Sequence, residues 1–373
     1  MKKDKLLFTP GPLTTSYTVK EAMLRDLGSR DFEFISTVQY VREKLLAAGE
    51  VSQQHGYETV IMQGSGTFGI ESVISSVVPA NGHLLIVING VYGERIAKMA
   101  AVYGIKHTKL VFDENEVPSL QKIEAALAAD KTITHLAVIH CETTTGIINP
   151  IEQIGGLCAE RNITYIVDAM SSFGAVPINL ALCNIDFLIS SSNKCIEGVP
   201  GFSFVIARKE SLLKCEGIAR TLSLDLYAQW KGLETDGQFR FTPPTHSLLA
   251  FAQALKELEE EGGVAGRGKR YQSNYNTLLA GMKELGFKEY LEKEKRGYII
   301  TCFHYPAHPN FDFKKFYELL NEKDFVIYPG KLSKVNCFRI GNIGRITTTD
   351  IHNLLGAIKT TLAEMKIELT TSA

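Results

Sequence analysis

The chain has 373 residues, of which 45% are hydrophobic and 22% are charged. This is the composition of a globular protein, so a mainly disordered chain is excluded. The 40 basic and 41 acidic residues give a formal net charge of -1, which supplies no long-range field to attract nucleic-acid phosphates or an anionic membrane surface. We therefore expect that the protein binds neither nucleic acid nor a membrane.

The N-terminus predicts no secretion signal. Only Leu6, Leu7 and Phe8 precede Thr9-Pro10-Gly11-Pro12, and this is too short for the apolar part of a signal peptide. Elsewhere the apolar runs have the length of strands and fall far below the roughly 20 residues of a membrane span. The seven cysteines are an odd number without a CxxC pair, so they indicate neither a disulfide framework nor a metal site. This pattern favours the cytoplasm and no bound metal.

From about residue 58, short apolar runs rich in β-branched residues alternate with amphipathic stretches. The runs predict strands over residues 59–62, 84–88, 135–140, 164–167, 187–189 and 202–207. This alternation predicts an α/β fold in which a mostly parallel sheet is flanked by helices. A predicted helix over residues 247–261 then ends at Gly262-Gly263.

The pattern changes after residue 263. It predicts a charged helix over 270–284, a strand over 298–303, an amphipathic helix over 313–322, strands over 325–328 and 337–340, and a final helix from Thr349. Because such a piece has the size of a small α+β domain, we expect a large domain over residues 1–263 and a smaller C-terminal domain over 264–373.

A glycine-rich loop, Gly64-Ser65-Gly66-Thr67-Phe68-Gly69, follows the first of these strands and precedes a helical pattern. It satisfies the dinucleotide fingerprint G-x-G-x-x-G. However, the next strand ends in Asn89-Gly90 and offers no acid for the ribose hydroxyls, so we discount a nicotinamide cofactor. Small residues at a helix N-terminus would suit a single phosphate; a tight turn without a ligand is the alternative.

Asp168 and Lys194 each follow a predicted strand. If these strands are parallel neighbours, both side chains reach the edge of the sheet where open α/β folds bind ligands. A phosphate anchor, an acid for a ring nitrogen and an amine for a Schiff base are what pyridoxal 5'-phosphate requires. Alone, Asp168 could be a helix cap and Lys194 a solvated surface lysine. Their order after the glycine loop favours the cofactor.

With these residues in place, the sequence resembles the class V, fold-type I pyridoxal-phosphate aminotransferases, and among them those that act on 2-aminoethylphosphonate. The resemblance runs from end to end. The segments that carry it are residues 7–15, 63–67, 140–146, 165–173, 191–201, 223–227, 240–246, 328–330 and 338–344. It implies the fold of that family, a large cofactor-binding domain with a smaller C-terminal one.

The resemblance also implies roles for individual residues. Lys194 would form the Schiff base and Asp168 would pair with the ring nitrogen. Ser65, Gly66 and Thr67 of the glycine loop would hold the phosphate, and the cofactor ring would stack on Tyr92. Thr143, Met170 and Asn193 would also contact the cofactor. A half-buried core tyrosine remains the alternative for Tyr92.

Two further implications concern a second subunit and the substrates. Thr242 matches a residue that the neighbouring subunit donates to the phosphate, so a homodimer is expected. Arg339, in Phe338-Arg339-Ile340-Gly341-Asn342, matches the arginine that binds the substrate anion, and its planar fork suits a carboxylate or a phosphonate. Thr14 and Thr15 would support the same anion. A surface ion pair is the alternative for Arg339.

The activity that the resemblance implies is amino transfer from 2-aminoethylphosphonate to pyruvate, which gives phosphonoacetaldehyde and L-alanine in phosphonate degradation. An alanine–glyoxylate or serine–pyruvate transaminase of the same fold is the alternative, and amino-donor preference separates the two. A cysteine desulfurase would need a reactive cysteine in a mobile glycine-rich segment, and none of the seven stands in one. A phosphate-binding protein without catalysis would give Lys194 no role.

Overall fold

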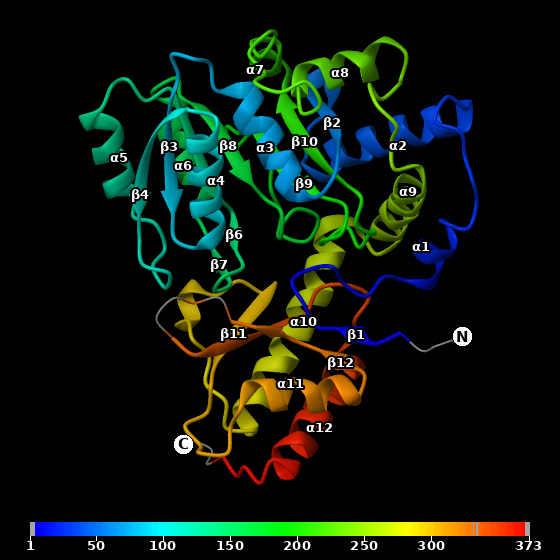
Figure 1. Cartoon of the computed structure of the whole chain (residues 1–373), viewed down its shortest axis with the longest axis vertical. Helices are drawn as coiled ribbons and strands as arrows, with labels where there is room; N and C mark the ends of the chain where they lie inside the picture. The colour runs from blue at the N-terminus through cyan, green and yellow to red at the C-terminus, as the bar shows by residue number, and fades with distance from the viewer. Residues whose placement is uncertain (1–3, 331, 333–334, 370–373) are drawn as a thin grey trace.

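The computed structural model describes residues 4–330, 332 and 335–369, and it has two parts along its long axis (Figure 1). The upper part in this view holds the large sheet, the lower part a smaller sheet, and α10 runs between them. The strands are β1 (Leu6–Leu7), β2 (Tyr57–Gln63), β3 (His83–Ile88), β4 (Lys106–Val111), β5 (His135–Ile139), β6 (Cys141–Glu142), β7 (Ile147–Ile148), β8 (Thr164–Asp168), β9 (Phe187–Ser191), β10 (Phe202–Arg208), β11 (Ile300–His304), β12 (Phe325–Val326), β13 (Tyr328–Pro329) and β14 (Cys337–Gly341). The helices are α1 (Tyr17–Glu21), α2 (Phe32–Ala48), α3 (Gly66–Val77), α4 (Val91–Val102), α5 (Leu120–Ala129), α6 (Ile151–Ala159), α7 (Lys209–Leu213), α8 (Leu226–Thr235), α9 (Thr245–Glu260), α10 (Gly263–Glu284), α11 (Phe313–Glu322) and α12 (Thr348–Glu364).

The large sheet has seven strands in the order β2-β10-β9-β8-β5-β3-β4. Neighbours from β9 to β4 pair in parallel, and β10 pairs antiparallel with both β9 and β2. Among the described strands of this sheet, β10 alone therefore runs against the others. The predicted α/β fold with a mostly parallel sheet is confirmed, as are the six strands predicted for it.

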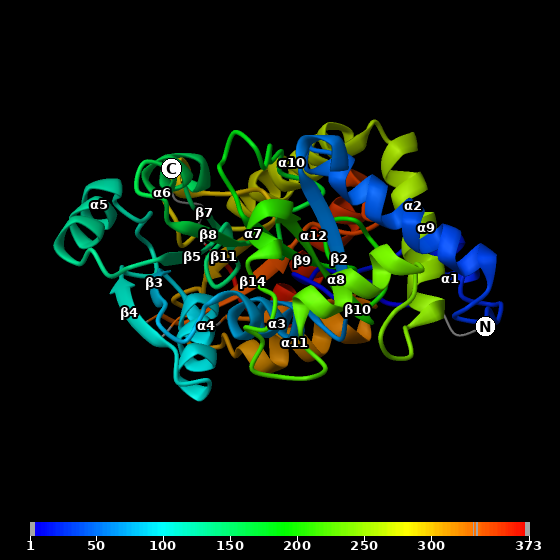
Figure 2. The ribbon, with the colours of Figure 1, turned by 90° about the horizontal axis from the view of Figure 1, so that it is seen from above.

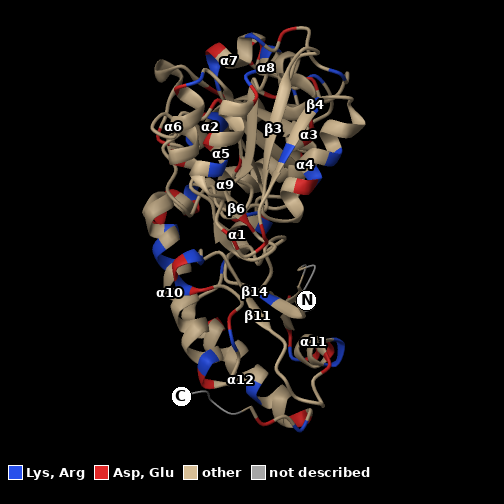
Figure 3. Cartoon of the chain, turned by 90° about the vertical axis from the view of Figure 1, so that its left-hand side faces the viewer, with Lys and Arg blue, Asp and Glu red and all other residues tan. Residues whose placement is uncertain are grey.

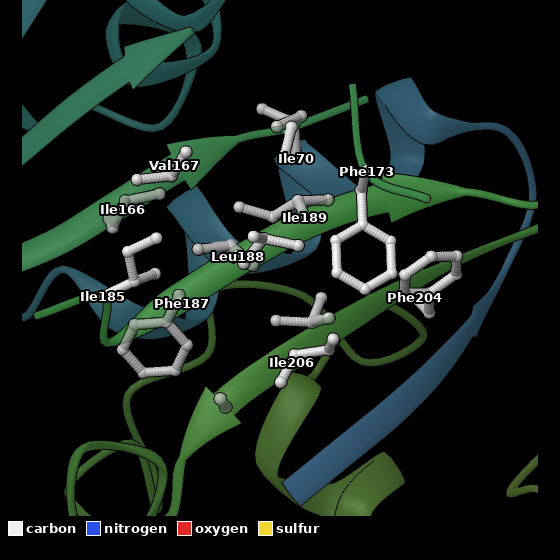
Figure 4. Packing of buried hydrophobic residues seen from close by; sticks show 14 of the residues in the cluster. Ile70, Ile166, Val167, Phe173, Ile185, Phe187, Leu188, Ile189, Phe204 and Ile206 are labelled. Atoms are coloured by element: carbon white, nitrogen blue, oxygen red, sulfur yellow. The ribbon is translucent and has the colours of Figure 1, made fainter. Parts of the chain in front are cut away.

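The core of the large sheet consists of aliphatic and aromatic side chains from its central strands and from α3. In Figure 4, Ile70 of α3 lies over the strand that carries Ile189, and the rings of Phe173 and Phe204 meet edge to face with centroids 5.6 Å apart. The buried strands read as continuous apolar runs because helices cover both faces of the sheet. Each fully buried side chain of this kind contributes roughly 1.5–3 kcal/mol.

Helices α3 and α4 cover one face of the sheet, and α2, α5 and α6 cover the other (Figures 2 and 3). Several helices begin at polar caps that the sequence supplies. The side chains of Asp31, Ser119 and Asp225 accept hydrogen bonds from the first turns of α2, α5 and α8. Such caps satisfy backbone N–H groups that have no partner within the helix. By contrast, Ser65 makes no side-chain cap at the start of α3.

The C-terminal part has its own sheet, β11-β14-β13, and its own apolar cluster with α11 and α12. The N-terminus joins this part, because β1 pairs in parallel with β12 and Phe8 belongs to the same cluster. The predicted division into residues 1–263 and 264–373 stays a prediction. It assigns the N-terminal segment to the large domain, whereas that segment packs on the C-terminal part.

The prediction was wrong for the start of α10, which begins at Gly263 rather than near Arg270. Two glycines of this helix lie where other backbone comes close: a Cβ on Gly266 would lie 1.9 Å from the carbonyl oxygen of Glu261, and a Cβ on Gly268 would lie 2.5 Å from that of Ala175. Strand β4 was also missed. Four of its six residues are polar or charged, so the sequence shows no apolar run there.

Charged side chains of both signs are interspersed over the two parts of the molecule (Figure 3). Within the described residues, no helix is long and apolar enough to cross a membrane.

Candidate active site

A cavity of about 220 Å³ lies where the parallel strands of the large sheet end. Strands β2, β3, β5, β8 and β9 run in the same direction, so the residues that follow them meet at one edge, the usual ligand-binding edge of an open α/β sheet. The lining residues include many predicted from the sequence: Ser65, Gly66, Thr67, Tyr92, Thr143, Asp168, Met170, Asn193 and Lys194.

The glycine loop at the start of α3 forms part of the cavity lining. Gly64 has a φ of +96°, which favours glycine, and a Cβ on Gly66 would lie 2.2 Å from the sulfur of Met170. Because Ser65 makes no side-chain cap, the first N–H groups of the helix remain available to an anion. The loop is therefore shaped to bring backbone close to a bound group.

Asp168 is the last residue of β8 and is buried. Its Oδ1 accepts a hydrogen bond from the backbone N–H of Met170 at 2.9 Å. Burial raises the pKa of its carboxyl group to about 6, against the opposing effects of that bond and of the Lys194 and Arg95 charges. Ionisation of a carboxyl group in this position is costly unless a positively charged partner lies next to it.

Lys194 lies three residues beyond β9, and its Nζ donates to the carbonyl oxygen of Pro10 at 2.5 Å. Burial lowers the pKa of this amine, while the nearby Tyr92 and Asp168 oppose the shift. The N-terminal segment packs directly on the side chain: a Cβ on Gly11, which has a φ of +102°, would lie 2.6 Å from Cδ of Lys194. Glycine is thus required where this segment crosses the lysine.

The remaining predicted residues of the cavity come from three other segments. Tyr92 lies in the first turn of α4 and is half-buried. Thr143 lies between β6 and β7, and Asn193 precedes the lysine and accepts a hydrogen bond from Ser191 Oγ at 3.1 Å. The lining of the cavity therefore combines an aromatic ring, polar side chains and a buried carboxyl group.

These residues fit pyridoxal 5'-phosphate. The cavity exceeds the 150 Å³ that holds a benzene ring, so it can take one substituted six-membered ring. The uncapped start of α3 offers donors to a phosphate, Asp168 offers its buried carboxylate to a ring nitrogen, and Lys194 offers an amine whose pKa is lowered. Within the described residues, no group of three or more potential metal ligands occurs.

Four predicted residues lie outside the lining of this cavity. Arg339 is buried within β14, and its Nη1 and Nε donate to the carbonyl oxygens of Thr143 and Pro329. Thr14 and Thr15 are half-buried, and Thr14 Oγ1 accepts a hydrogen bond from the backbone of Leu7. Thr242 is exposed, and its carbonyl oxygen accepts from the side chain of Gln63.

Sequence reasoning missed several lining residues. Arg95 lies one turn after Tyr92 on α4, and the i, i+3 spacing could have indicated that both face the cavity. Cys141, Ser171 and Ser191 also line it. Glu142, next to the lining, is fully buried, and burial raises the pKa of its carboxyl group to about 7.

Comparison with known proteins gives a consistent result. The model of the family described as aminotransferase class-V matches residues 14–337. Proteins of Salmonella paratyphi C and Salmonella typhimurium named 2-aminoethylphosphonate–pyruvate transaminase are 52% identical over 362 residues, 96% of this chain and 98% of theirs.

Solved structures are similar over nearly the whole chain. An alanine–glyoxylate aminotransferase from Nostoc sp. is 27% identical with a TM-score of 0.89, covering 97% of this chain and 96% of that one. A pyridoxamine–pyruvate aminotransferase from Mesorhizobium loti is 23% identical with a TM-score of 0.90, covering 99% and 95%; at this identity the likeness shows the fold alone.

Proposed function

The chain belongs to the class-V aminotransferase family, and we propose that it transfers the amino group of 2-aminoethylphosphonate to pyruvate, giving phosphonoacetaldehyde and L-alanine. The observation that carries the proposal is the 52% identity, over nearly the full length, to relatives named for that reaction. The cavity at the carboxyl edge of a fold-type I sheet supports it.

Its cofactor is pyridoxal 5'-phosphate, which the family requires and the cavity fits. When bound, this group accepts the electrons released at the substrate carbon and carries the amino group from one substrate to the other. Ser65, Gly66 and Thr67 would hold its phosphate, Tyr92 and Met170 would lie on its ring, Thr143 and Asn193 would contact its polar edges, and Asp168 its ring nitrogen.

Lys194 is proposed as the group that bonds to the cofactor and moves a proton. Because burial lowers the pKa of its amine, a larger share of Lys194 is neutral and able to accept a proton at pH 7. The hydrogen bond to the Pro10 carbonyl holds Nζ at the cavity. Released from the cofactor, this amine would take the proton from the amine-bearing carbon of the donor.

Asp168 would hold a proton at the ring nitrogen. Burial raises the pKa of its carboxyl group to about 6, so a carboxylate without a partner is unfavourable there, and a protonated ring nitrogen would supply the opposite charge. The hydrogen bond from Met170 fixes the orientation of the carboxylate. This fixed geometry is the part of the electron-accepting chemistry that the protein itself supplies.

Arg339 is proposed to bind the phosphonate of the donor and the carboxylate of pyruvate, with Thr14 and Thr15 nearby. Two of its nitrogens are held by backbone carbonyl oxygens, so Nη2 is the nitrogen left for an anion. The contact with Thr143 connects the arginine to the lining of the cavity. No acidic side chain lies within ion-pair distance of Arg339 among the described residues, which favours an anionic ligand over the surface ion pair.

A homodimer is part of the proposal. Thr242 is exposed and does not line the cavity of its own chain, as expected if it is donated to a partner. Large apolar side chains are exposed on the adjoining segments: Phe68, Leu222 and Phe241. Gln63 and Arg240 join these segments through hydrogen bonds to backbone carbonyl oxygens. Exposed apolar groups of this kind are typical of a subunit interface.

We further propose that the protein acts in the cytoplasm, in phosphonate degradation. All seven cysteines carry buried free thiols, a state that a reducing compartment maintains.

The test is a panel of amino donors with pyruvate as acceptor. We expect 2-aminoethylphosphonate to give stoichiometric phosphonoacetaldehyde and L-alanine with the highest kcat/KM. L-Serine with pyruvate, and L-alanine with glyoxylate, represent the alternative transaminase of the same fold. A higher kcat/KM for either of these pairs would overturn the substrate proposal and leave the family intact.

A further inference from the structure

Arg95 lies between two cavities. It lines the cofactor cavity and also an outer cavity of about 800 Å³ to which α4 contributes. Among the described residues, Arg95 is the one that lines both cavities. The outer cavity reaches Tyr290 in the C-terminal part. Arg95 is half-buried, so it is positioned to contact a ligand in the cofactor cavity.

The contacts of Arg95 point toward the glycine loop. Its Nη1 donates to Oγ1 of Thr67 at 3.2 Å. Its guanidinium carbon lies 4.9 Å from the centre of the Tyr92 ring, where a cation–π contact fixes the side chain. The charge therefore lies beside the uncapped start of α3.

This charge lacks an acidic partner. Within the described part of the chain, no carboxylate lies within 4 Å of the Arg95 guanidinium. Among the same residues, Thr67 Oγ1 is the one hydrogen-bond acceptor of this side chain. The neighbouring Glu94 is engaged elsewhere, with Lys109 at 2.8 Å. Asp168 interacts with Arg95 at longer range, since the Arg95 charge lowers the pKa of that carboxyl group. An arginine held against an aromatic ring with most of its donors free is prepared for an anion.

We propose that Arg95 binds the phosphate dianion of the cofactor, together with Thr67 and the first N–H groups of α3. The inference rests on the use of pyridoxal 5'-phosphate and adds to the phosphate site a side-chain cation from α4. A planar guanidinium offers parallel N–H groups to two phosphate oxygens, and the helix N-terminus adds partial positive charge from the other side.

A purely structural role for Arg95 makes a different prediction. If the arginine served only to orient the Tyr92 ring, its loss would weaken every ring that stacks there, with or without a phosphate. If it binds phosphate, its loss would weaken only ligands that carry one. Pyridoxal, which has the same ring without the phosphate, separates the two roles.

The experiment uses the full-length apoenzyme and measures dissociation constants for pyridoxal 5'-phosphate and for pyridoxal by absorbance titration. Arg95→Gln removes the charge, and Arg95→Lys keeps it without the fork. Lys98→Gln is the matched control. Lys98 is exposed one turn later on α4 and lines the outer cavity but not the cofactor cavity. Protection of the apoenzyme by inorganic phosphate in thermal unfolding is a second readout.

We expect Arg95→Gln to raise the dissociation constant for pyridoxal 5'-phosphate about 10- to 100-fold, the range for a hydrogen bond to a charged group, and to leave that for pyridoxal unchanged. Inorganic phosphate should protect the wild type and Lys98→Gln but not Arg95→Gln. Arg95→Lys should lie between. Unchanged affinity in Arg95→Gln, or equal losses for both ligands, would overturn the inference. Failure of the wild type to bind the cofactor would instead contradict the proposed function.

Discussion

Arg339 donates a hydrogen bond from Nη1 to the carbonyl oxygen of Thr143 at 2.7 Å, although 196 residues separate the two in the sequence. Arg339 belongs to β14 in the C-terminal part, and Thr143 lines the cavity at the edge of the large sheet. The bond therefore connects the proposed anion-binding residue to the wall of the cofactor cavity. A substrate anion held at Nη2 would lie between the two parts of the molecule.

Replacement of Arg339 should impair both substrates. Arg339→Gln removes the charge, and we expect kcat/KM for 2-aminoethylphosphonate and for pyruvate to fall about 10²-fold or more, as for loss of a buried charge contact. Alanine would also leave the Thr143 carbonyl without its donor, so glutamine is the better variant. The exposed Arg345 provides the control Arg345→Gln. Steady-state kinetics with both substrates tests this role. An unchanged kcat/KM for both would show that Arg339 does not bind the substrate anion.

Gly11→Ala should disturb Lys194. The added Cβ would lie 2.6 Å from Lys194 Cδ and 2.9 Å from the carbonyl oxygen of Asn193, at a φ that alanine rarely adopts. Since a displacement of about 1 Å can cost 10²-fold in rate, we expect kcat to fall by about that factor. Gly28→Ala is the matched control, because no atom lies within 4 Å of its added Cβ. Equal rates in the two variants would show that the N-terminal segment does not position the lysine.

Glu142 should make stability depend on pH. Burial raises the pKa of its carboxyl group to about 7, against hydrogen bonds from Thr144. The folded-state pKa lies above the usual glutamate value of 4.5, so between about pH 4.5 and pH 7 the native protein binds a proton that the unfolded chain has released. The stability it contributes is complete below about pH 4.5 and is lost as the pH rises through about 7.

The Glu142→Gln variant keeps an acceptor for Thr144 and does not titrate. From pH 5 to pH 8 we expect the wild-type holoenzyme to lose about 2–3 kcal/mol of unfolding free energy relative to this variant. Urea unfolding at the two pH values measures the difference. Parallel pH profiles for the two proteins would contradict the buried, protonated state of Glu142.

The proposed dimer can be tested at its exposed apolar side chains. Leu222 is 75% exposed, and Leu222→Glu should shift the protein toward monomers and weaken cofactor binding, because Thr242 would be lost from the neighbouring site. Leu182 is 69% exposed and belongs to none of these segments, and Leu182→Glu is the control. Light scattering after size-exclusion chromatography gives the mass. A wild type that is monomeric and active would refute the dimer.

The sequence predicted the large sheet well, because its strands are apolar runs buried on both faces. It also predicted that Asp168 and Lys194 lie at one edge of the sheet, because parallel strands bring the residues that follow them together there. Strand β4 and the first turns of α10 were missed. Most of Lys106–Val111 is exposed at the sheet edge, and Gly266 and Gly268 of α10 lie where other backbone comes close.

The contacts between distant segments could not be predicted from spacing. The bonds from Arg339 to Thr143 and from Lys194 to Pro10 join residues that only the folded arrangement brings together. Arg95 is similar, since its hydrogen bond to Thr67 connects two helices. Periodicity predicts which face of an element is buried, but it does not predict which partner the buried group meets.

The most direct test of the proposed function is the visible absorption spectrum of the purified holoenzyme. We predict a band from the cofactor bound to Lys194 that bleaches on addition of 2-aminoethylphosphonate, more readily than with L-alanine or L-serine, and returns on addition of pyruvate. Lys194→Ala should fold normally and lack this response. A wild-type band that 2-aminoethylphosphonate leaves unchanged, or a normal response in Lys194→Ala, would contradict the account.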